Sequence, residues 1–160
     1  EMLRSLVGSE MCIRDSIETM SDNDIILLFR EKGLRLTPQR MNIYLTLCEL
    51  HHPTAEEVWE AVRKKIPAIT VATIYNTLEC LVSSQLAEKV FTLDNKMYFD
   101  ADTRPHQHLY DNHSHCIADL HDEQLTGLIL EHIKKNKQLS NFELQDIKIQ
   151  LIGHYTSPEK

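Results

Sequence analysis

The chain has 160 residues, of which 42% are hydrophobic and 26% charged, and its formal net charge is −7. That length is enough for one domain or two small ones, and no apolar run approaches the ~18 residues that a membrane-spanning helix needs. The four cysteines form neither a CxxC pair nor a regular framework, which excludes a disulfide-stabilised secreted domain and favours the reducing cytoplasm.

The two ends of the chain differ from the rest. Residues 1–20 lack the basic stretch followed by an apolar stretch that a signal peptide has. We expect residues 1–20 to be a non-native or disordered extension and residues 154–160 to be a fraying tail.

Four helices are expected in the first half, because each apolar helical face follows a capping signal. The first helix ends at Gly33, the second begins at Thr37-Pro38, and the third, over residues 55–66, begins with the capping-box pair Thr54 and Glu57. The fourth, over residues 71–83, follows Thr70.

Two short strands, over residues 86–92 and 96–100, complete the outline of a winged helix-turn-helix. The last helix of such a domain enters the major groove of DNA, where polar side chains read base edges. The polar, exposed candidates on it are Thr70, Thr73, Tyr75, Asn76 and Thr77, and Arg35 and Arg40 are candidates for the phosphate backbone. A four-helix segment with a solvated polar surface fits the pattern equally well.

Histidines are dense between residues 106 and 115. On a strand, His106 and His108 share a face, and so do His113 and His115, because strand side chains repeat every two residues. Imidazoles with nearby carboxylates suit divalent Fe, Mn, Co, Ni or Zn. The acidic partners considered are Asp100, Asp111 and Asp119, and His52 lies in a loop that can fold back toward them.

After the histidines, the pattern predicts a helix over residues 122–135 and a strand over 142–152. A small α/β unit of this kind often completes its sheet with a second copy, so we expect a homodimer. The fold class is therefore α+β, with a winged helix-turn-helix followed by a small α/β dimerisation domain.

Six features follow one another along the chain: GLRLTPQR (33–40), HPTAEE (52–57), VATIYNTL (71–78), YFD (98–100), His106-x-His108 and Asp119. Together they resemble the ferric uptake regulator (Fur) family of bacterial repressors, over residues 24–152. The resemblance implies a dimeric, metal-dependent repressor of iron homeostasis or the peroxide response that is not an enzyme. The implied domains are residues 21–100, which bind DNA, and residues 101–153, which bind metal and dimerise.

The resemblance also implies one regulatory site per chain for Fe(II) or Mn(II), which Zn(II) can occupy in purified protein. Its ligands fall on His52, Asp100, His106, His108 and Asp119. The implied partner is an AT-rich palindromic duplex, with Arg35 in the minor groove and Tyr75 reading bases.

Departures from the family pattern narrow the expectation. The structural zinc of the family needs two CxxC pairs, and Asp111 and Ser114 stand where the first would be, so we expect no structural zinc held by four cysteines. Both peroxide-responsive members and the haem-responsive iron response regulator resemble this sequence, and the local sequence narrowly favours the iron response regulator. That resemblance makes haem a further possible ligand, although Gln107 interrupts the histidine run of the haem site. The alternatives from other classes are a non-haem metalloenzyme and a metal-buffering protein.

Overall fold

Residues 21–156 are described by the computed structural model, and they divide into a first unit up to Thr103 and a second unit from Arg104. The extension expected over residues 1–20 and the end of the tail, residues 157–160, lie outside the described residues. Among the described residues, no helix is long and apolar enough to cross a membrane.

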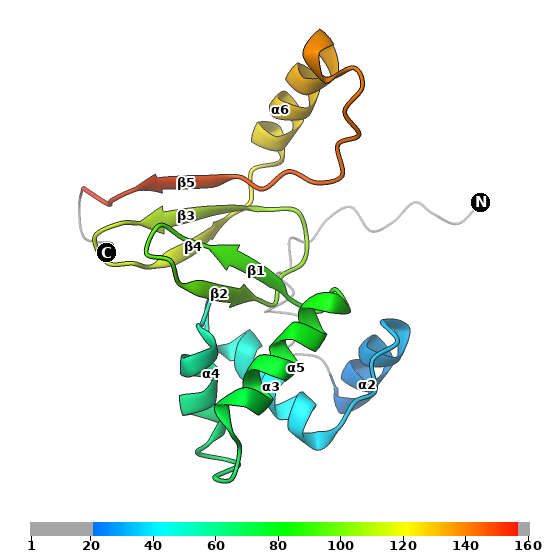
Figure 1. Cartoon of the computed structure of the whole chain (residues 1–160), viewed down its shortest axis with the longest axis vertical. Helices are drawn as coiled ribbons and strands as arrows, with labels where there is room; N and C mark the ends of the chain where they lie inside the picture. Colours follow the sequence, from blue (N-terminus) through cyan, green and yellow to red (C-terminus); the bar gives the residue numbers. More distant parts are fainter. Residues whose placement is uncertain (1–20, 157–160) are drawn as a thin grey trace. The chain divides into compact units, whose positions relative to one another are not determined.

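Over residues 21–103, the first unit contains four helices (Figure 1). Each of them is started by a side-chain cap. Ser21 and Thr54 both form complete capping boxes, and the hydroxyls of Thr37 and Thr70 each accept a backbone N–H bond. Such a cap contributes about 1 kcal/mol to a helix. The helices are α2 (Asp22–Glu31), α3 (Pro38–Glu49), α4 (Ala55–Val62) and α5 (Val71–Ser83).

The core of this unit lies among these helices. Ile43, Val58, Ile74 and Leu78 have no exposed surface, and burying a side chain of this size contributes about 1.5–3 kcal/mol. The indole N–H of Trp59 donates to the carbonyl of Ile69 over 3.1 Å, which fixes the turn between α4 and α5.

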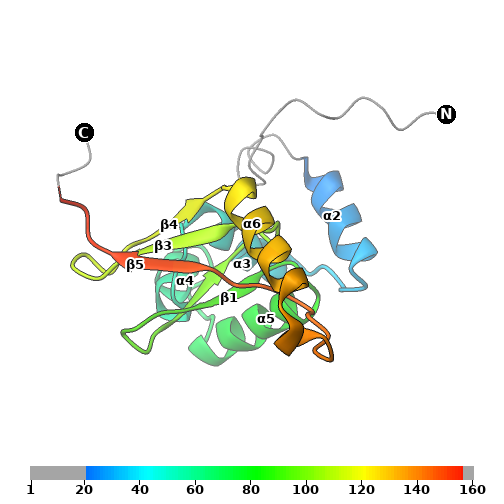
Figure 2. The same ribbon diagram turned by 90° about the horizontal axis from the view of Figure 1, so that it is seen from above.

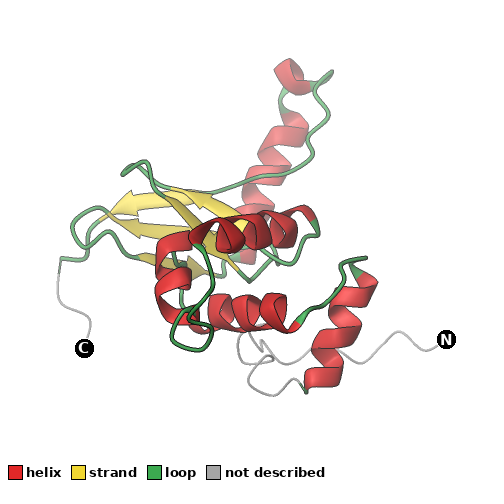
Figure 3. Cartoon of the chain, turned by 60° about the horizontal axis from the view of Figure 1, so that its bottom comes forward, coloured by secondary structure: helices red, strands yellow, loops and turns green. Residues whose placement is uncertain are grey.

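A two-stranded antiparallel hairpin follows α5 and forms the wing (Figure 3). Its strands are β1 (Glu88–Phe91) and β2 (Met97–Asp100). Phe99 of β2 is fully buried in the helical core, so the hairpin is anchored to the helices. The winged helix-turn-helix predicted from the sequence is confirmed.

The second unit is a three-stranded sheet with one long helix. The strand order is β4-β3-β5, in which β4 is antiparallel and β5 parallel to β3 (Figure 2). Its elements are β3 (Gln107–Asp111), β4 (Ile117–Leu120), α6 (Glu123–Lys135), the short 3-10 helix η1 (Lys137–Leu139) and β5 (Gln150–Gly153). The expected α+β class is confirmed.

Two expected element boundaries are wrong. The third helix ends at Val62 rather than residue 66, because the amides of Lys64 and Lys65 bond three residues back and form turns. The strand expected over residues 142–152 is confined to Gln150–Gly153, the four residues that pair with β3. Gly153 therefore belongs to this strand.

Candidate functional site

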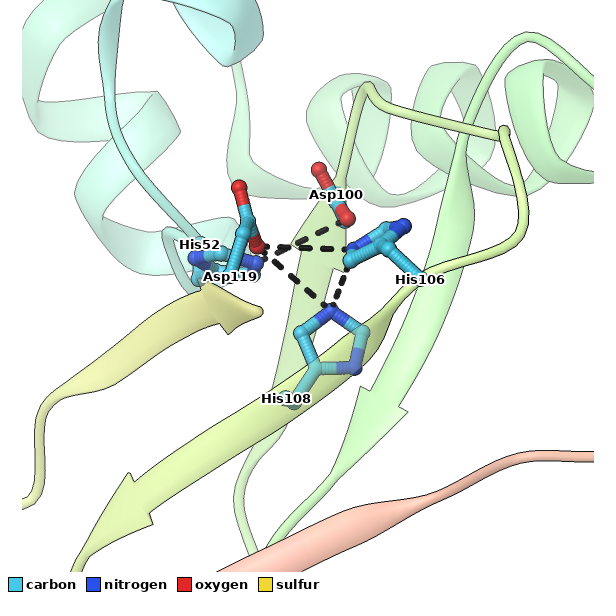
Figure 4. A group of neighbouring side chains, drawn as sticks. All are labelled: His52, Asp100, His106, His108 and Asp119. Atoms are coloured by element: carbon cyan, nitrogen blue, oxygen red, sulfur yellow. Dashed lines mark hydrogen bonds and ion pairs between the residues drawn. The ribbon is translucent and has the colours of Figure 1, made fainter. Parts of the chain in front are cut away.

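Three side chains of the second unit converge on one face of the sheet (Figure 4). His108 and Asp119 are direct partners in the β3–β4 ladder, and side chains that oppose one another across a ladder share a face. The Nε2 atom of His108 lies 3.8 Å from Asp119 Oδ1, and that of His106 lies 3.4 Å from the same oxygen. The two Nε2 atoms are 2.9 Å apart.

A backbone contact fixes the proton on His106. Its Nδ1 atom lies 2.7 Å from the carbonyl oxygen of Arg104. Because a carbonyl only accepts, Nδ1 carries the proton and Nε2 presents a lone pair toward His108 and Asp119. This is the tautomer and second contact that metal-binding histidines ordinarily have.

The first unit brings together a second pair, His52 and Asp100, with His52 Nε2 3.6 Å from Asp100 Oδ2 (Figure 4). The chain around Thr54 pairs with β2: the amide of Phe99 donates to the carbonyl of Pro53 over 2.9 Å. His52 itself has a φ of 46°. A left-handed conformation at a residue other than glycine is uncommon and is often found at functional sites.

The donor types fit a divalent transition metal. In the second unit, His106, His108 and Asp119 are two imidazoles and one carboxylate, the set typical of non-haem Fe(II). Donors bonded at about 2.1 Å to one ion stand roughly 3 Å apart at right angles, so the separations of 2.9, 3.4 and 3.8 Å need only small side-chain movements. The pair His52 and Asp100 offers one further imidazole and one further carboxylate.

The expectation that His113 and His115 share the face of a strand is wrong. Residues 112–114 form a turn, and His115 has a φ of 58°. The ring of His113 stacks on that of His154 with centroids 4.3 Å apart, while His115 Nδ1 lies 2.8 Å from the Tyr110 hydroxyl. Asp111, also considered as a ligand, accepts the backbone N–H groups of residues 113 and 114.

Most of the side chains predicted to read DNA lie on the surface of α5. Tyr75 and Asn76 are exposed, and Thr70 caps the helix with its hydroxyl 2.9 Å from that of Thr73. Thr77 is only 7% exposed, so the expectation that it is available to DNA is wrong. The helical repeat places it with Ile74 and Leu78 on the inner face.

Of the two arginines predicted to hold the phosphate backbone, Arg35 lies just before α3 and Arg40 lies in its first turn. Arg40 Nη1 donates to the carbonyl of Arg35 over 2.7 Å. The side chain of Arg35 itself is exposed. The contact orders the backbone that presents Arg35.

The sequence did not predict the side-chain contacts of two residues, Gln107 and Glu56. Buried Gln107 accepts the amide of Asp122 over 2.9 Å and donates to the Thr126 hydroxyl over 2.6 Å, which joins α6 to β3. Glu56 of α4 accepts a 2.7 Å bond from the Tyr75 hydroxyl. Neither contact has a short spacing that would reveal it, since the partners are 15 to 19 residues apart.

Comparisons with known proteins agree with this fold. The peroxide-responsive repressor PerR of Staphylococcus epidermidis is 37% identical over 142 residues, which cover 87% of this chain and 90% of that protein. The ferric uptake regulator Fur of Helicobacter pylori has a similar fold, with a TM-score of 0.70 at 17% identity over 93% of this chain and 95% of that one. The Fur of Pseudomonas aeruginosa, solved with manganese, has a TM-score of 0.67 at 23% identity. The match covers 86% of this chain and 100% of that one. Residues 31–152 match the ferric uptake regulator family, and the chain belongs to that family.

Proposed function

We propose that this protein is a metal-dependent transcriptional repressor whose α5 helix reads a DNA operator. The winged helix supports this, since it presents Tyr75 and Asn76 on the exposed side of its last helix. An asparagine side chain can bond adenine through two hydrogen bonds, and an aromatic ring can contact a thymine methyl. The DNA-binding set proposed is Arg35, Arg40, Thr70, Thr73, Tyr75 and Asn76.

The observation that carries the metal part of the proposal is the convergence of His106, His108 and Asp119. We propose that the ion held by these three side chains also binds His52 and Asp100. Three imidazoles and two carboxylates are a five-donor N/O set, which suits Fe(II) or Mn(II), and the two carboxylates neutralise the charge of the ion. Zn(II) can occupy the same donors in purified protein.

Shared ligands would couple metal binding to DNA binding. His52 and Asp100 belong to the unit that carries α5, whereas the other three ligands belong to the second unit. An ion bound to both sets selects one arrangement of the two units. Because a fixed arrangement removes part of the ordering cost of binding, the metal-loaded repressor binds its operator more tightly.

The signal that this repressor answers is proposed to be peroxide, with iron availability as the alternative. The support is the name of the relative at 37% identity, a peroxide-responsive repressor. Five protein donors leave one position of a six-coordinate iron, which a small oxidant can reach. Brief peroxide treatment of the Fe(II)-loaded protein should add oxygen to a peptide containing a ligand histidine, whereas the Mn(II)-loaded protein should be unchanged.

The second unit is proposed to pair with a copy of itself. No residue of α6 is buried, and Leu128 is 67% exposed. Strand β5 lies at the edge of the sheet, where Leu151 and Ile152 are 44% and 47% exposed. Exposed apolar groups at the edge of a sheet favour association, and a dimer matches the two half-sites of an AT-rich palindromic duplex.

The experiment that tests the proposed function follows a fluorescent AT-rich palindromic duplex by anisotropy, with and without Mn(II). The expected result is tighter, sequence-selective binding with Mn(II) at two chains per duplex. A random duplex of the same composition is the control, because non-specific binding to phosphates does not depend on sequence. Equal affinity for both duplexes, with or without Mn(II), would favour a metalloenzyme or a metal buffer.

A further inference from the structure

One acidic side chain lies beside the residue proposed to read bases. Glu56, in the first turn of α4, accepts a 2.7 Å hydrogen bond from the hydroxyl of Tyr75 on α5. Both side chains are on the surface, and Tyr75 is 38% exposed. A carboxylate here is unexpected on a DNA-facing surface, since it repels phosphates.

We propose that Glu56 is a positioning residue for DNA recognition: it holds the Tyr75 hydroxyl, so that Tyr75 contacts a base through its ring and not a phosphate through its hydroxyl. This inference rests on the proposed function, because it assigns a role within the same DNA-binding surface. It also narrows the role of Tyr75, whose hydroxyl could otherwise bond a phosphate oxygen.

The geometry favours a fixed ring. A hydrogen bond to an ionised acceptor is stronger than one between neutral groups, and an orientation fixed before binding lowers the ordering cost of the complex. The ends of the bond are anchored separately: α4 is started by the Thr54–Glu57 capping box, and the turn into α5 is fixed by Trp59. In agreement, the bond to Glu56 raises the pKa of Tyr75, chiefly because the carboxylate favours the protonated hydroxyl.

Glu56 can also stabilise α4 itself, and the experiment must distinguish that effect from the positioning of Tyr75. A carboxylate in the first turn of a helix is stabilised by the helix dipole, so replacing it with alanine can weaken α4. Glutamine keeps an oxygen that can accept the Tyr75 bond but removes the charge. Phenylalanine at position 75 keeps the ring and removes the donor, while leaving α4 unchanged.

The experiment measures the ratio of affinities for the palindromic duplex and for a random duplex, using Mn(II)-loaded protein. A ratio is used because removing one negative charge strengthens binding to all DNA alike. Glu56→Ala and Tyr75→Phe should each lower the ratio about three- to tenfold. Glu56→Gln, which keeps an acceptor for the Tyr75 hydroxyl, should have a ratio close to that of the unaltered protein. Glu49→Gln, at an exposed site at the end of α3, is the charge-matched control and should leave the ratio unchanged.

The double variant Glu56→Ala/Tyr75→Phe gives the decisive comparison. If Glu56 acts through the Tyr75 hydroxyl, Glu56→Ala has no further effect once that hydroxyl is gone. Additive losses, or an unchanged ratio in Tyr75→Phe, would overturn the inference, and so would a Glu56→Gln ratio as low as that of Glu56→Ala. Should Glu56→Ala fail to fold, Tyr75→Phe and Glu56→Gln still decide the question.

Tyr75→Ala distinguishes failure of this inference from failure of the proposal that α5 reads DNA bases. It should lower the ratio at least tenfold, because it removes the ring as well as the hydroxyl. If it leaves the ratio unchanged, Tyr75 does not read DNA and that part of the proposed function fails. If it lowers the ratio while Tyr75→Phe does not, only the role of Glu56 is contradicted.

Discussion

His108 and Asp119 face each other across the β3–β4 ladder, with Nε2 of His108 3.8 Å from Oδ1 of Asp119. The hairpin register alone produces this pairing, and His106 joins it because its ring is turned by the carbonyl of Arg104. Because the backbone sets both positions, only small side-chain movements are needed for the three donors to bind one ion, which limits the ordering cost of metal binding.

Asp119→Asn should weaken Mn(II) binding by roughly tenfold or more, about 1.4 kcal/mol. The amide keeps the size of the side chain but removes a negative charge that the ion needs. Isothermal titration with Mn(II) measures the change. Asp146→Asn, at an exposed position of the same unit, is the matched control, and an equal loss there would show that the effect is only net charge.

Gln107→Ala should loosen the start of α6. The variant removes the acceptor of the Asp122 amide and the partner of the Thr126 hydroxyl, and an unpaired buried polar group costs about 1–3 kcal/mol. Faster hydrogen exchange at the amide of Asp122, with exchange in α3 unchanged, is the expected result. Unaltered exchange at Asp122 would mean that the helix is held by other contacts.

Purified protein should contain no zinc that resists a chelator. A structural zinc site built from cysteines alone needs four thiolates that can converge, whereas Cys48 is buried in α3, Cys80 lies in α5 and Cys116 is in the other unit. Elemental analysis after dialysis against EDTA measures the bound metal. One zinc per chain remaining after that treatment would contradict the expectation.

Acid should weaken α2 through Asp24. The Ser21 hydroxyl and amide both donate to its carboxylate, which lowers the pKa of Asp24 below the ordinary 3.8. Because the folded pKa is the lower one, the stabilisation is fully present above pH 3.8 and is lost as the pH falls through the folded pKa.

Asp24→Asn therefore should speed hydrogen exchange in α2 at neutral pH, and the difference from the unaltered chain should disappear at about pH 2. Carboxyl NMR of Asp24 measures the pKa directly. A difference that is the same at all pH values would show that the charge of Asp24 has no part in capping.

The fold was largely predictable because local signals mark its helices. The Thr54–Glu57 box and the Thr37-Pro38 start both lie where expected, since caps depend on residues three positions apart. The last strand is shorter than the expected residues 142–152, because strand length depends on a partner that is distant in the chain.

The site was only partly predictable for the same reason. The spacing of His106 and His108 gave their shared direction. Asp119 and His52 were considered from their place in the chain, but resemblance to the family was needed to assign them as ligands. His113 was misjudged because a turn, not a strand, follows Asp111. The bond between Glu56 and Tyr75 depends on the packing of two helices, which the sequence pattern does not encode locally.

The most direct test of the proposal that metal binding tightens DNA binding compares the unaltered protein with His106→Ala/His108→Ala on one palindromic duplex. The affinity of each protein is measured by anisotropy as Mn(II) is added. Ion-dependent tightening is expected for the unaltered protein alone, while circular dichroism shows that both remain folded. If the double variant responds to Mn(II) as strongly as the unaltered chain, these two imidazoles do not control DNA binding.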